Sequence, residues 1–478
     1  MKIKFYYVLL VLLLLSLGLV ACGEAAPTSP SNGVATATSN VAAVTTAPIQ
    51  TTTPNVVTLP TTTPLPTTAA AATTTTASQS TTSAATTTTA SQSTTSAATT
   101  APPVVETIKP KTASSTTKVN NSVRLAYVDG GSLYVIEVAT KVKKLLVQGG
   151  QQTIQGDPTW SPDDSQIIVA LQSKTKVAGT SRAELYTVNP ESGETKRLLT
   201  AQPDNASDTE PVWSPDGTTL AFTRLFPTTT TEPLRGRHEV WLVDANGQNP
   251  RKLADGQQPA WSPDNLRLAF VTDGVIKPGL SIPQGNALHL INAKGQNEWE
   301  PLTAAKVPND LSKFNYPFGG AAYILQYPVF LEGGKTLGFT TIGATGLVLT
   351  INSSTGGDLK MWSGQPEGGF GRAFAQPKGG SLLMYESFPP SGVRVVSLVD
   401  VTKTPGGDKP ALQNFGAIGK GEALFPAWSP DGSQIAYAST STNGSATSAN
   451  ATLVIGKVGS TDTTELVKGT ITGVDWSN

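Results

Sequence analysis

Two kinds of reactive side chain are almost absent from this sequence of 478 residues. It contains one cysteine, Cys22, and two histidines, His238 and His289. A single cysteine excludes an internal disulfide, so the folded part has to be stable through packing alone. Two histidines and one cysteine serve zinc ligation poorly. They also leave little for nucleophilic hydrolysis, which needs a base beside a Ser or Cys.

An excess of charge of either sign is absent as well. Lys plus Arg and Asp plus Glu both number 34, so the formal net charge is zero. No basic stripe with interleaved aromatic residues is present, and nothing favours a nucleic acid or an anionic membrane surface as a partner. We therefore expect no nucleic-acid partner.

The two histidines and the acidic stretch from Asp204 to Glu210 have structural interpretations. His289 alternates with Leu288 and Leu290, which predicts a half-buried strand residue, and His238 is expected at a loop edge. The acidic stretch lacks the spacing and glycine of a calcium-binding loop and is assigned to a solvated connection. We expect no metal, no cofactor and no catalytic residue.

What the sequence does have is a repeat of the form Trp-Ser-Pro-Asp. Each copy is followed by a short apolar run, such as Leu220 to Phe222. Self-similarity with a period of about 50 residues indicates a repeat architecture. The motif tryptophans and aspartates are Trp160 with Asp163, Trp213 with Asp216, Trp261 with Asp264, and Trp428 with Asp431.

The motif predicts a tight reversal between two strands. Proline fixes φ at the second position of a type I turn, and a following glycine tolerates positive φ. A proline two residues before each tryptophan predicts a short entering strand. Third strands such as Glu239 to Asp244 and short fourth strands follow. Each repeat is thus a four-stranded antiparallel meander, the blade of a β-propeller, and the recurring aspartate is assigned to turn chemistry.

Counting blades requires the degenerate copies at Phe330 and Phe374 and the final Trp476. First strands ending at 160, 213, 261, 330, 374, 428 and 476 predict an all-β, seven-bladed propeller over residues 121–478. Six blades is the alternative, because the copies at Phe330 and Phe374 are weak. The segment from Val474 is a first strand without partners, while the segment from Val123 lacks a first strand, so both termini should complete one blade together.

The repeat Pro-x-Trp-Ser-Pro-Asp-Gly-x-x-Leu-Ala-Phe resembles the WD40-like repeat of TolB-type propellers and of some prolyl peptidases. Four copies match well, and the resemblance covers roughly residues 121–478. It is specific for the type of blade and says little about function, because the same blade serves binding proteins, enzyme accessory domains and sensors. The resemblance implies a propeller that lies outside the cytoplasm and binds something. TolB itself differs in having an N-terminal α/β domain and six blades.

The N-terminal region has the features of an exported, lipid-anchored protein. Lys2 and Lys4 precede an apolar run from Phe5 to Val20, as in a secretory signal. The sequence before Cys22 resembles the lipobox of bacterial lipoproteins, in which this cysteine carries the lipid. We expect a signal peptide over residues 1–21 and a lipid-anchored location in the bacterial cell envelope, facing outside the cytoplasm; an uncleaved anchor is the alternative.

Residues 22–120 follow as a linker of Thr, Ala, Ser and Pro with few charges. A 13-residue string occurs twice in tandem there, at 73–85 and 86–98. Such a composition cannot bury enough apolar surface to offset chain entropy, so we expect a disordered stalk. It serves either as an inert spacer or as an O-glycosylated stalk.

The candidate binding residues follow from blade topology. In an up-and-down blade, the connection between strands two and three and the connection to the next blade lie at one end, here named the loop face. The Ser-Pro-Asp-Gly turns lie at the other end, the turn face. Long segments belong to the loop face, where binding residues are expected. The candidates are Phe314, Tyr316 and Phe318 as aromatic anchors and Lys174, Arg182, Arg235 and Arg237 as cations.

Three functions compete. The preferred one is a non-enzymatic, monomeric lipoprotein that binds an envelope or extracellular protein through its loop face, although the three aromatics alternatively cover a blade edge. The second is binding of cell-wall or extracellular glycan with Tyr316, Tyr323 or Trp299 as platforms. The third is an enzyme in the central channel, which is disfavoured because only two of the expected channel positions are carboxylates. Those positions are Asp157, Glu210, Gln258, Tyr327, Gly371, Phe425 and Gly473.

Overall fold

The structure is a computed structural model that describes the propeller region of the chain. The described residues are 122–150, 152–174, 181–227, 236–275, 284–314, 322–366, 369–388, 393–405, 413–415, 421–440 and 450–478. The expected signal peptide, Cys22 and the linker lie outside these residues. Within the described ranges, no helix has the length and apolar character needed to span a membrane.

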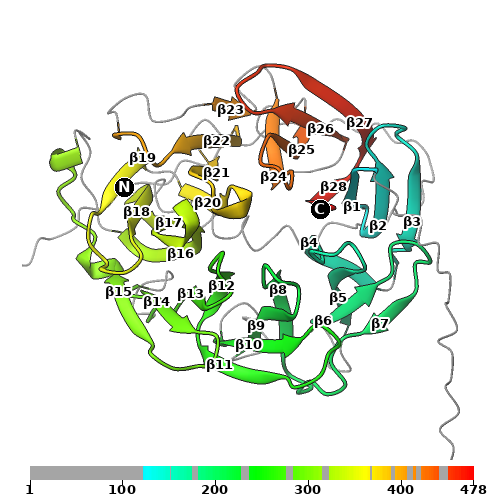
Figure 1. Ribbon diagram of the computed structural model, residues 1–478, viewed down its shortest axis with the longest axis horizontal. Coiled ribbons are helices and arrows are strands. Elements are labelled where there is room, and N and C mark those ends of the chain that lie inside the picture. Colours follow the sequence, from blue (N-terminus) through cyan, green and yellow to red (C-terminus); the bar gives the residue numbers. More distant parts are fainter. Residues whose placement is uncertain are drawn as a thin grey trace, which may run out of the picture. The chain divides into compact units, whose positions relative to one another are not determined.

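Seven four-stranded antiparallel sheets form a ring of blades (Figure 1). The predicted all-β, seven-bladed propeller is confirmed, and the six-bladed alternative is wrong, because the weak copies at Phe330 and Phe374 each belong to a separate blade.

Blade 1 takes its first strand from the C-terminal end of the chain, and blades 2 to 4 follow in sequence order. The strands are, for blade 1, β28 (Ile471–Trp476), β1 (Arg124–Asp129), β2 (Ser132–Glu137) and β3 (Lys143–Val147); for blade 2, β4 (Gln152–Trp160), β5 (Ile167–Lys174), β6 (Ser181–Val188) and β7 (Thr195–Arg197); for blade 3, β8 (Ser207–Trp213), β9 (Thr219–Pro227), β10 (Gly236–Asp244) and β11 (Arg251–Asp255); for blade 4, β12 (Gln257–Trp261), β13 (Arg267–Val271), β14 (Ala287–Asn292) and β15 (Trp299–Thr303).

Blades 5 to 7 continue this order, and four short 3-10 helices lie in connections. The strands are, for blade 5, β16 (Ala322–Leu331), β17 (Thr336–Gly343), β18 (Thr345–Asn352) and β19 (Lys360–Pro366); for blade 6, β20 (Gly369–Ala375), β21 (Leu382–Phe388), β22 (Val395–Asp400) and β23 (Gln413–Phe415); for blade 7, β24 (Glu422–Trp428), β25 (Gln434–Thr440), β26 (Ala451–Lys457) and β27 (Thr463–Gly469); the 3-10 helices are η1 (Ala304–Lys306), η2 (Ser312–Phe314), η3 (Glu332–Gly334) and η4 (Pro377–Gly379).

The expected joining of the two ends is confirmed in blade 1. β28 pairs antiparallel with β1, with Leu125 opposite Trp476 and Tyr127 opposite Val474. Trp476 is 4% exposed, and its indole N–H donates to the carbonyl oxygen of Ala427 in blade 7 at 3.1 Å. The C-terminal strand therefore closes the ring on two sides, through its sheet partner and through the neighbouring blade.

The first strands surround the axis, and all of them carry a bulge. The pairing register between first and second strands shifts around Pro158, Pro211, Pro259 and Pro426. The expectation that these prolines keep the entering strand short is wrong for β4, which has nine residues and includes Pro158. The first strand is an inner edge, so a proline placed at a bulge does not remove a needed hydrogen bond.

The hydrophobic core is divided into clusters between neighbouring blades. One cluster joins Ile168 and Leu185 of blade 2 to Trp213 and Phe222 of blade 3. Trp160 and Trp428 are buried at equivalent places, at 3% and 8% exposure. The motif tryptophan thus forms the apolar contact between its own blade and the preceding one, which agrees with a ring held by packing.

The motif turns share one hydrogen-bond pattern, which explains the Ser-Pro-Asp sequence. In each, the serine hydroxyl donates to Oδ1 of the aspartate two residues later, at 2.6 Å for Asp163, Asp216 and Asp431 and at 2.5 Å for Asp264. The same serine oxygen accepts the backbone N–H that opens the second strand, as Ser429 does from Gln434 at 2.9 Å. The aspartates therefore stabilise the turns, as the sequence predicts.

Connection lengths differ between the two ends of the ring. On the turn face, the connections between first and second strands are short, for example 214–218 and 429–433. On the loop face, long connections span 228–235, 272–286, 304–321 and 441–450. There is one exception to the predicted pattern, because the connection 401–412 between β22 and β23 is an insertion on the turn face.

Candidate functional site

The structure describes part of the predicted binding set on the loop face. Arg235, Tyr316 and Phe318 lie outside the described residues. Lys174 ends β5, and its side chain is also outside the description. Of Tyr323, named as a possible glycan platform, only the backbone in β16 is described.

Phe314 lies in a connection that is partly built into the core. It is partly buried and packs against the cluster between blades 4 and 5. Val307 and Leu311 of the same connection are 3% and 1% exposed and belong to that cluster. Trp299 also packs there. These contacts are the blade-covering role that was the alternative for Phe314.

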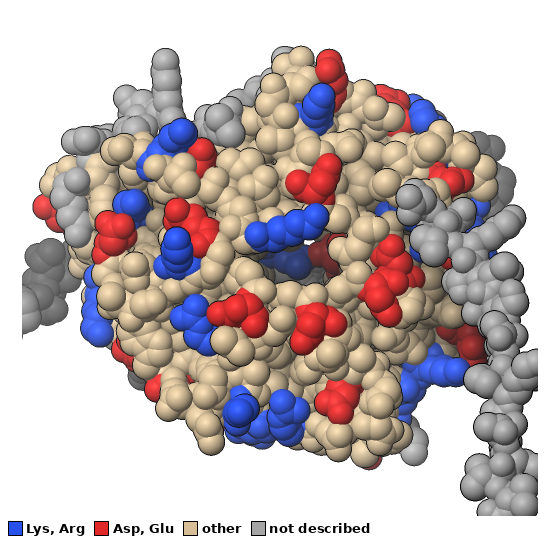
Figure 2. All heavy atoms as spheres, viewed as in Figure 1, with Lys and Arg blue, Asp and Glu red and all other residues tan. Residues whose placement is uncertain are grey.

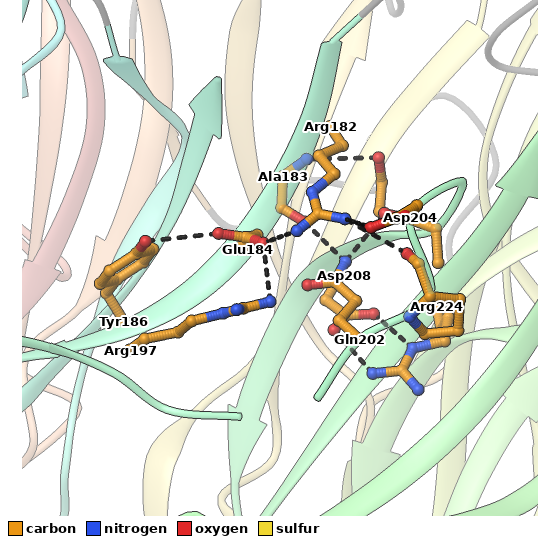
Figure 3. A network of polar contacts seen from close by, with 12 residues as sticks. Arg182, Ala183, Glu184, Tyr186, Arg197, Gln202, Asp204, Asp208 and Arg224 are labelled. Carbon is orange, nitrogen blue, oxygen red and sulfur yellow. Dashed lines mark hydrogen bonds and ion pairs between the residues drawn. The ribbon is translucent and has the colours of Figure 1, made fainter. Parts of the chain in front are cut away.

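Arg182 takes part in an ion-pair network at the loop-face end of blade 2 (Figure 3). Its guanidinium pairs with Glu184, and Arg197 of β7 reaches the same carboxylate at 2.7 Å. Asp204 adds a longer contact to Arg182 at 3.4 Å. Glu184 is 8% exposed, so two guanidinium groups offset the cost of burying it.

Beside this network lies a buried ion pair within blade 3. Asp208 of β8 and Arg224 of β9 form two parallel hydrogen bonds of 2.7 and 2.8 Å (Figure 3). The guanidinium of Arg224 also lies 4.3 Å from the ring centroid of Trp241. Such a bidentate, stacked arginine fixes strand geometry at the start of the blade. Arg237 of β10, in the same blade, forms a further ion pair with Glu239.

Both histidines have carboxylate neighbours. His238 Nδ1 lies 2.7 Å from Asp273 Oδ1, and the backbone N–H of His238 donates to Oδ2 of the same carboxylate at 3.0 Å. His289 stacks on Phe270 with ring centroids 5.3 Å apart and lies 2.7 Å from Glu298. The two side chains are 15% and 18% exposed. His289 is thus the half-buried strand residue that the sequence predicts. His238 lies near the start of β10, at the loop edge of the blade.

The central channel carries polar groups from six blades. Thr223 of blade 3 donates to Glu210 Oε2 at 2.8 Å, and the backbone N–H of Gln258 donates to the Thr223 hydroxyl at 3.0 Å. Gln258 Oε1 in turn accepts the backbone N–H of Tyr327 in blade 5 at 2.8 Å. On the other side of the axis, Asp475 Oδ2 accepts the backbone N–H of Trp160 at 2.8 Å. These bonds link neighbouring first strands around the axis.

One contact crosses the channel between blades that are not neighbours. Arg372 of blade 6 forms an ion pair with Asp157 of blade 2. A basic side chain lies across the central hollow in Figure 2. The Arg372 side chain is 44% exposed and that of Asp157 is 15% exposed, so water reaches the pair. We name this contact the axial ion pair.

Several features position Arg372. Its backbone N–H donates to Glu386 Oε2 at 3.1 Å, and its guanidinium lies 5.0 Å from the ring centroid of Phe374. A Cβ at Gly371 would lie 2.6 Å from the same Glu386 oxygen and 2.6 Å from the Phe388 ring. A side chain at this position would have to displace the Glu386 carboxylate and the Phe388 ring, which glycine leaves in place.

The pKa values of several channel groups are shifted by burial and by the neighbouring carboxyl groups. Burial raises the pKa of Asp475 to about 7, and Asp157 nearby adds to this, although backbone N–H groups of Trp160 and Trp476 oppose it. Burial also raises the pKa of Glu386, against the influence of Arg372. Burial alone would lower the pKa of Arg372, but Asp157 and Glu386 raise it overall. The guanidinium therefore stays charged.

The sequence identified Asp157, Glu210, Gln258 and Tyr327 as channel positions, and their contacts agree with that. It missed Arg372, Glu386 and Asp475, because only one position per blade was considered. Side chains alternate between the two faces of a strand, and a bulge changes this alternation. The side on which Asp475 and Arg372 lie can therefore be predicted only when the positions of the bulges are known. The pairing of Arg372 with Asp157 depends on closure of the whole ring, which no local pattern contains.

Comparison with known proteins extends the description of the fold. No family model and no curated protein matches the chain. Among solved structures, the chain is similar to an oligogalacturonate lyase in complex with manganese, at 15% identity over 64% of this chain and 79% of that one, with a TM-score of 0.42. It is also similar to TolB from Acinetobacter baumannii, at 14% identity over 73% and 80%, with a TM-score of 0.41. A third similar structure is dipeptidyl peptidase 4 from Porphyromonas gingivalis, at 12% identity over 72% of this chain and 57% of that one, with a TM-score of 0.38.

These likenesses concern the fold alone. They include TolB, as the resemblance of the repeat implies, and they also include enzymes. The number of blades is established by the strand pairing of this chain itself.

Proposed function

We propose that this protein is a non-catalytic, lipid-anchored binding protein of the bacterial cell envelope, whose propeller holds an envelope or extracellular protein on its loop face. The observation that carries the proposal is the distribution of connections. Four blades or blade junctions have long connections at the loop face, at 228–235, 272–286, 304–321 and 441–450. Insertions on a rigid scaffold are where binding residues concentrate.

Non-catalytic binding is supported by how the reactive groups are engaged. His238 and His289 both pair with carboxylates, Asp273 and Glu298. A hydrolase would need, in addition, a Ser or Cys nucleophile hydrogen-bonded to one of these histidines.

Lipid anchoring is supported by the sequence around Cys22. The basic start, the apolar run and the cysteine occur in the order that a lipoprotein signal requires. Residues 22–120 would then act as a tether of roughly 55 Å root-mean-square span, by the scaling of flexible linkers. A propeller on such a tether reaches partners well away from the membrane.

The test is in-cell crosslinking with the full-length protein as bait. One variant has residues 315–321 replaced by a shorter Gly-Ser segment, which keeps the buried Val307 and Leu311 in place. The matched control shortens residues 406–412, which belong to the insertion on the turn face. We expect a partner protein that is captured by the wild type and the control but lost with the loop-face variant.

Capture that is unaffected by the loop-face variant and lost with the turn-face control would contradict the proposed face. A separate variant, Cys22→Ala, tests the anchor. It should not incorporate labelled fatty acid in cells, whereas the wild type should. Equal fatty-acid labelling of both, or no labelling of the wild type, would contradict lipidation at Cys22.

A further inference from the structure

A cavity on the turn face has no place in the proposed function. It has a volume of about 500 Å³ and lies between blades 2 and 3. It is bounded by the β4–β5 turn, the β6–β7 turn and the β10–β11 turn, which all belong to the turn face. The lining residues are Ser165, Gln166, Thr187, Asn189, Glu194, Lys196, Arg197, Leu198, Ala245 and Asn246.

Two asparagines line this cavity, and each uses its amide oxygen within its own turn. Asn189 Oδ1 accepts the backbone N–H groups of Glu191 and Ser192, both at 2.8 Å. Asn246 Oδ1 accepts the backbone N–H of Gln248 at 3.0 Å. Because each amide oxygen is held by its own turn, the NH₂ group on the opposite side of each amide is oriented away from that turn. Both residues are exposed.

Cationic groups stand beside these amides. Lys196 lies 3.0 Å from Glu194, with side chains 70% and 59% exposed, so this surface pair exchanges partners at little cost. Arg197 is anchored at one end by Glu184 at 2.7 Å and remains 35% exposed. The lining thus holds two cations and one carboxylate, and its side-chain donors outnumber its acceptors.

We propose that this cavity binds a polar ligand through an oxyanion, either a carboxylate or a phosphate. Lysine, arginine and amide N–H groups form short, charge-assisted hydrogen bonds to such groups. The lining contains no aromatic residue, so recognition depends on hydrogen bonds and charge and not on stacking against a sugar ring. Thr187 and Gln166 line the same cavity and offer hydroxyl and amide groups to the uncharged part of the ligand.

Calorimetric titration of the full-length protein tests this with four probes: glucose, glucuronate, glucose 6-phosphate and inorganic phosphate. We expect glucuronate, glucose 6-phosphate or both to bind and glucose not to bind. The two anionic sugars distinguish a carboxylate from a phosphate source. Binding of inorganic phosphate as tight as that of the sugar phosphate would assign all recognition to the oxyanion.

Two substitutions link binding to the cavity. Asn246→Asp keeps the oxygen that accepts from Gln248 but replaces the donor with a negative charge, and Lys196→Gln removes an exposed cation. Each should weaken binding of the anionic probe by about tenfold or more, the factor expected for a lost hydrogen bond to a charged group. Asn292→Asp is the matched control, because Asn292 Oδ1 also accepts turn N–H groups, from Lys294 and Gln296, in blade 4.

The control should bind the probe like the wild type, and all three variants should have the melting temperature of the wild type within a few degrees. The proposal is overturned if glucose binds as tightly as its anionic derivatives, if no probe binds, or if neither Asn246→Asp nor Lys196→Gln changes the affinity. Because the cavity lies on the turn face, these outcomes are independent of whether a protein is captured by the loop face.

Discussion

At the scale of single residues, Asp475 shows how ring closure sets the properties of one carboxyl group. It belongs to β28, which completes blade 1, and it accepts a hydrogen bond from Trp160 of blade 2 at 2.8 Å. Its pKa of about 7 lies above the ordinary range because of burial in the channel wall. The group therefore holds its proton more tightly in the folded than in the unfolded chain.

This shift has a defined sign for stability. A raised folded-state pKa stabilises the fold fully below about pH 4, the unfolded value, and the contribution disappears as pH rises to about 7. Asp475→Asn keeps an oxygen acceptor for Trp160 and cannot ionise. Since water reaches the partly exposed carboxyl, we expect the variant to gain about 1 to 2 kcal/mol over the wild type at pH 8 and nothing at pH 4.

Denaturant unfolding at a series of pH values between 4 and 8 measures this difference. Asp475→Ala is the control, because it loses the acceptor and should be less stable than Asp475→Asn at every pH. A difference between wild type and Asp475→Asn that does not change with pH would show that the carboxyl titrates normally.

The axial ion pair carries a second prediction at this scale. Arg372 and Asp157 are joined across the axis, and the arginine is half exposed. A double-mutant cycle with Arg372→Gln and Asp157→Asn should give a coupling energy of up to about 1 kcal/mol. Raising the salt from about 0.1 M to about 1 M shortens the screening length from about 10 Å to about 3 Å, so the coupling should fall.

Arg372→Gln alone should cost more stability than Asp157→Asn alone, because it leaves Glu386 and the other channel carboxyl groups without their cation. Both single variants and the double variant are compared by chemical unfolding. A coupling energy of zero at low salt would mean that the two side chains do not meet across the channel in solution.

At the scale of elements, the motif turn determines where each blade reverses. Ser429 donates to Asp431 at 2.6 Å, and Asp431 also accepts from the backbone N–H of Ser433 at 3.0 Å. These hydrogen bonds lower the pKa of Asp431 to about 2. The stabilisation is present above the unfolded pKa of about 4 and is lost as pH falls through about 2.

Asp431→Ala should therefore lower the free energy of unfolding by about 1 kcal/mol at neutral pH, the usual net value of such hydrogen bonds. Asp431→Asn retains a neutral acceptor and should lose less. The loss in Asp431→Ala relative to wild type should shrink below about pH 3, which thermal unfolding at acid pH measures. An equal loss at neutral and acid pH would assign the effect to the backbone alone.

The elements were predictable from sequence to the extent that their determinants are local. Turn chemistry and apolar alternation gave the hairpins of blades 2, 3, 4 and 7, and their spacing located the weak copies at Phe330 and Phe374. The bulge in each first strand was not predicted, because the proline was interpreted as a residue that keeps the entering strand short. On an inner edge the proline N position needs no partner, so the strand continues through it.

The candidate sites were less predictable than the blades for a physical reason. Trp213 finds its neighbours Ile168 and Leu185 through one blade-to-blade step that every repeat shares. Arg372 and Asp157 meet only after all seven blades close, and the cavity at Asn246 and Lys196 needs two turns from different blades. Contacts of this kind depend on the number and spacing of blades and not on the residues beside them in the sequence.

At the scale of the whole molecule, the ring depends on β28. Ile471, Val474 and Trp476 are 0%, 2% and 4% exposed and belong to the cluster that also contains Leu125, Tyr127 and Leu424. Removing the strand exposes both the edge of β1 and the side of blade 7. No other segment of the described chain pairs with β1 on that side.

Deletion of residues 471–478 should consequently cost more than the loss of any single side chain. Burial of a tryptophan in a core is worth about 3 to 5 kcal/mol by substitution with alanine, and the deletion removes the other two buried side chains and the sheet hydrogen bonds as well. We expect a sharp fall in the melting temperature, measured by circular dichroism, together with broadening of the transition as blades lose cooperativity.

Deletion of Asn478 alone is the matched control. It removes an exposed contact from its backbone N–H to Asp164 at 2.7 Å and a part-buried contact from its amide to the carbonyl oxygen of Ser161 at 3.2 Å. The melting temperature should change little, because such bonds lie at the solvent-exposed end of the strand. If the long deletion melted like this control, blade 1 would not need its C-terminal strand. The ring would then be held by the remaining six blade interfaces alone.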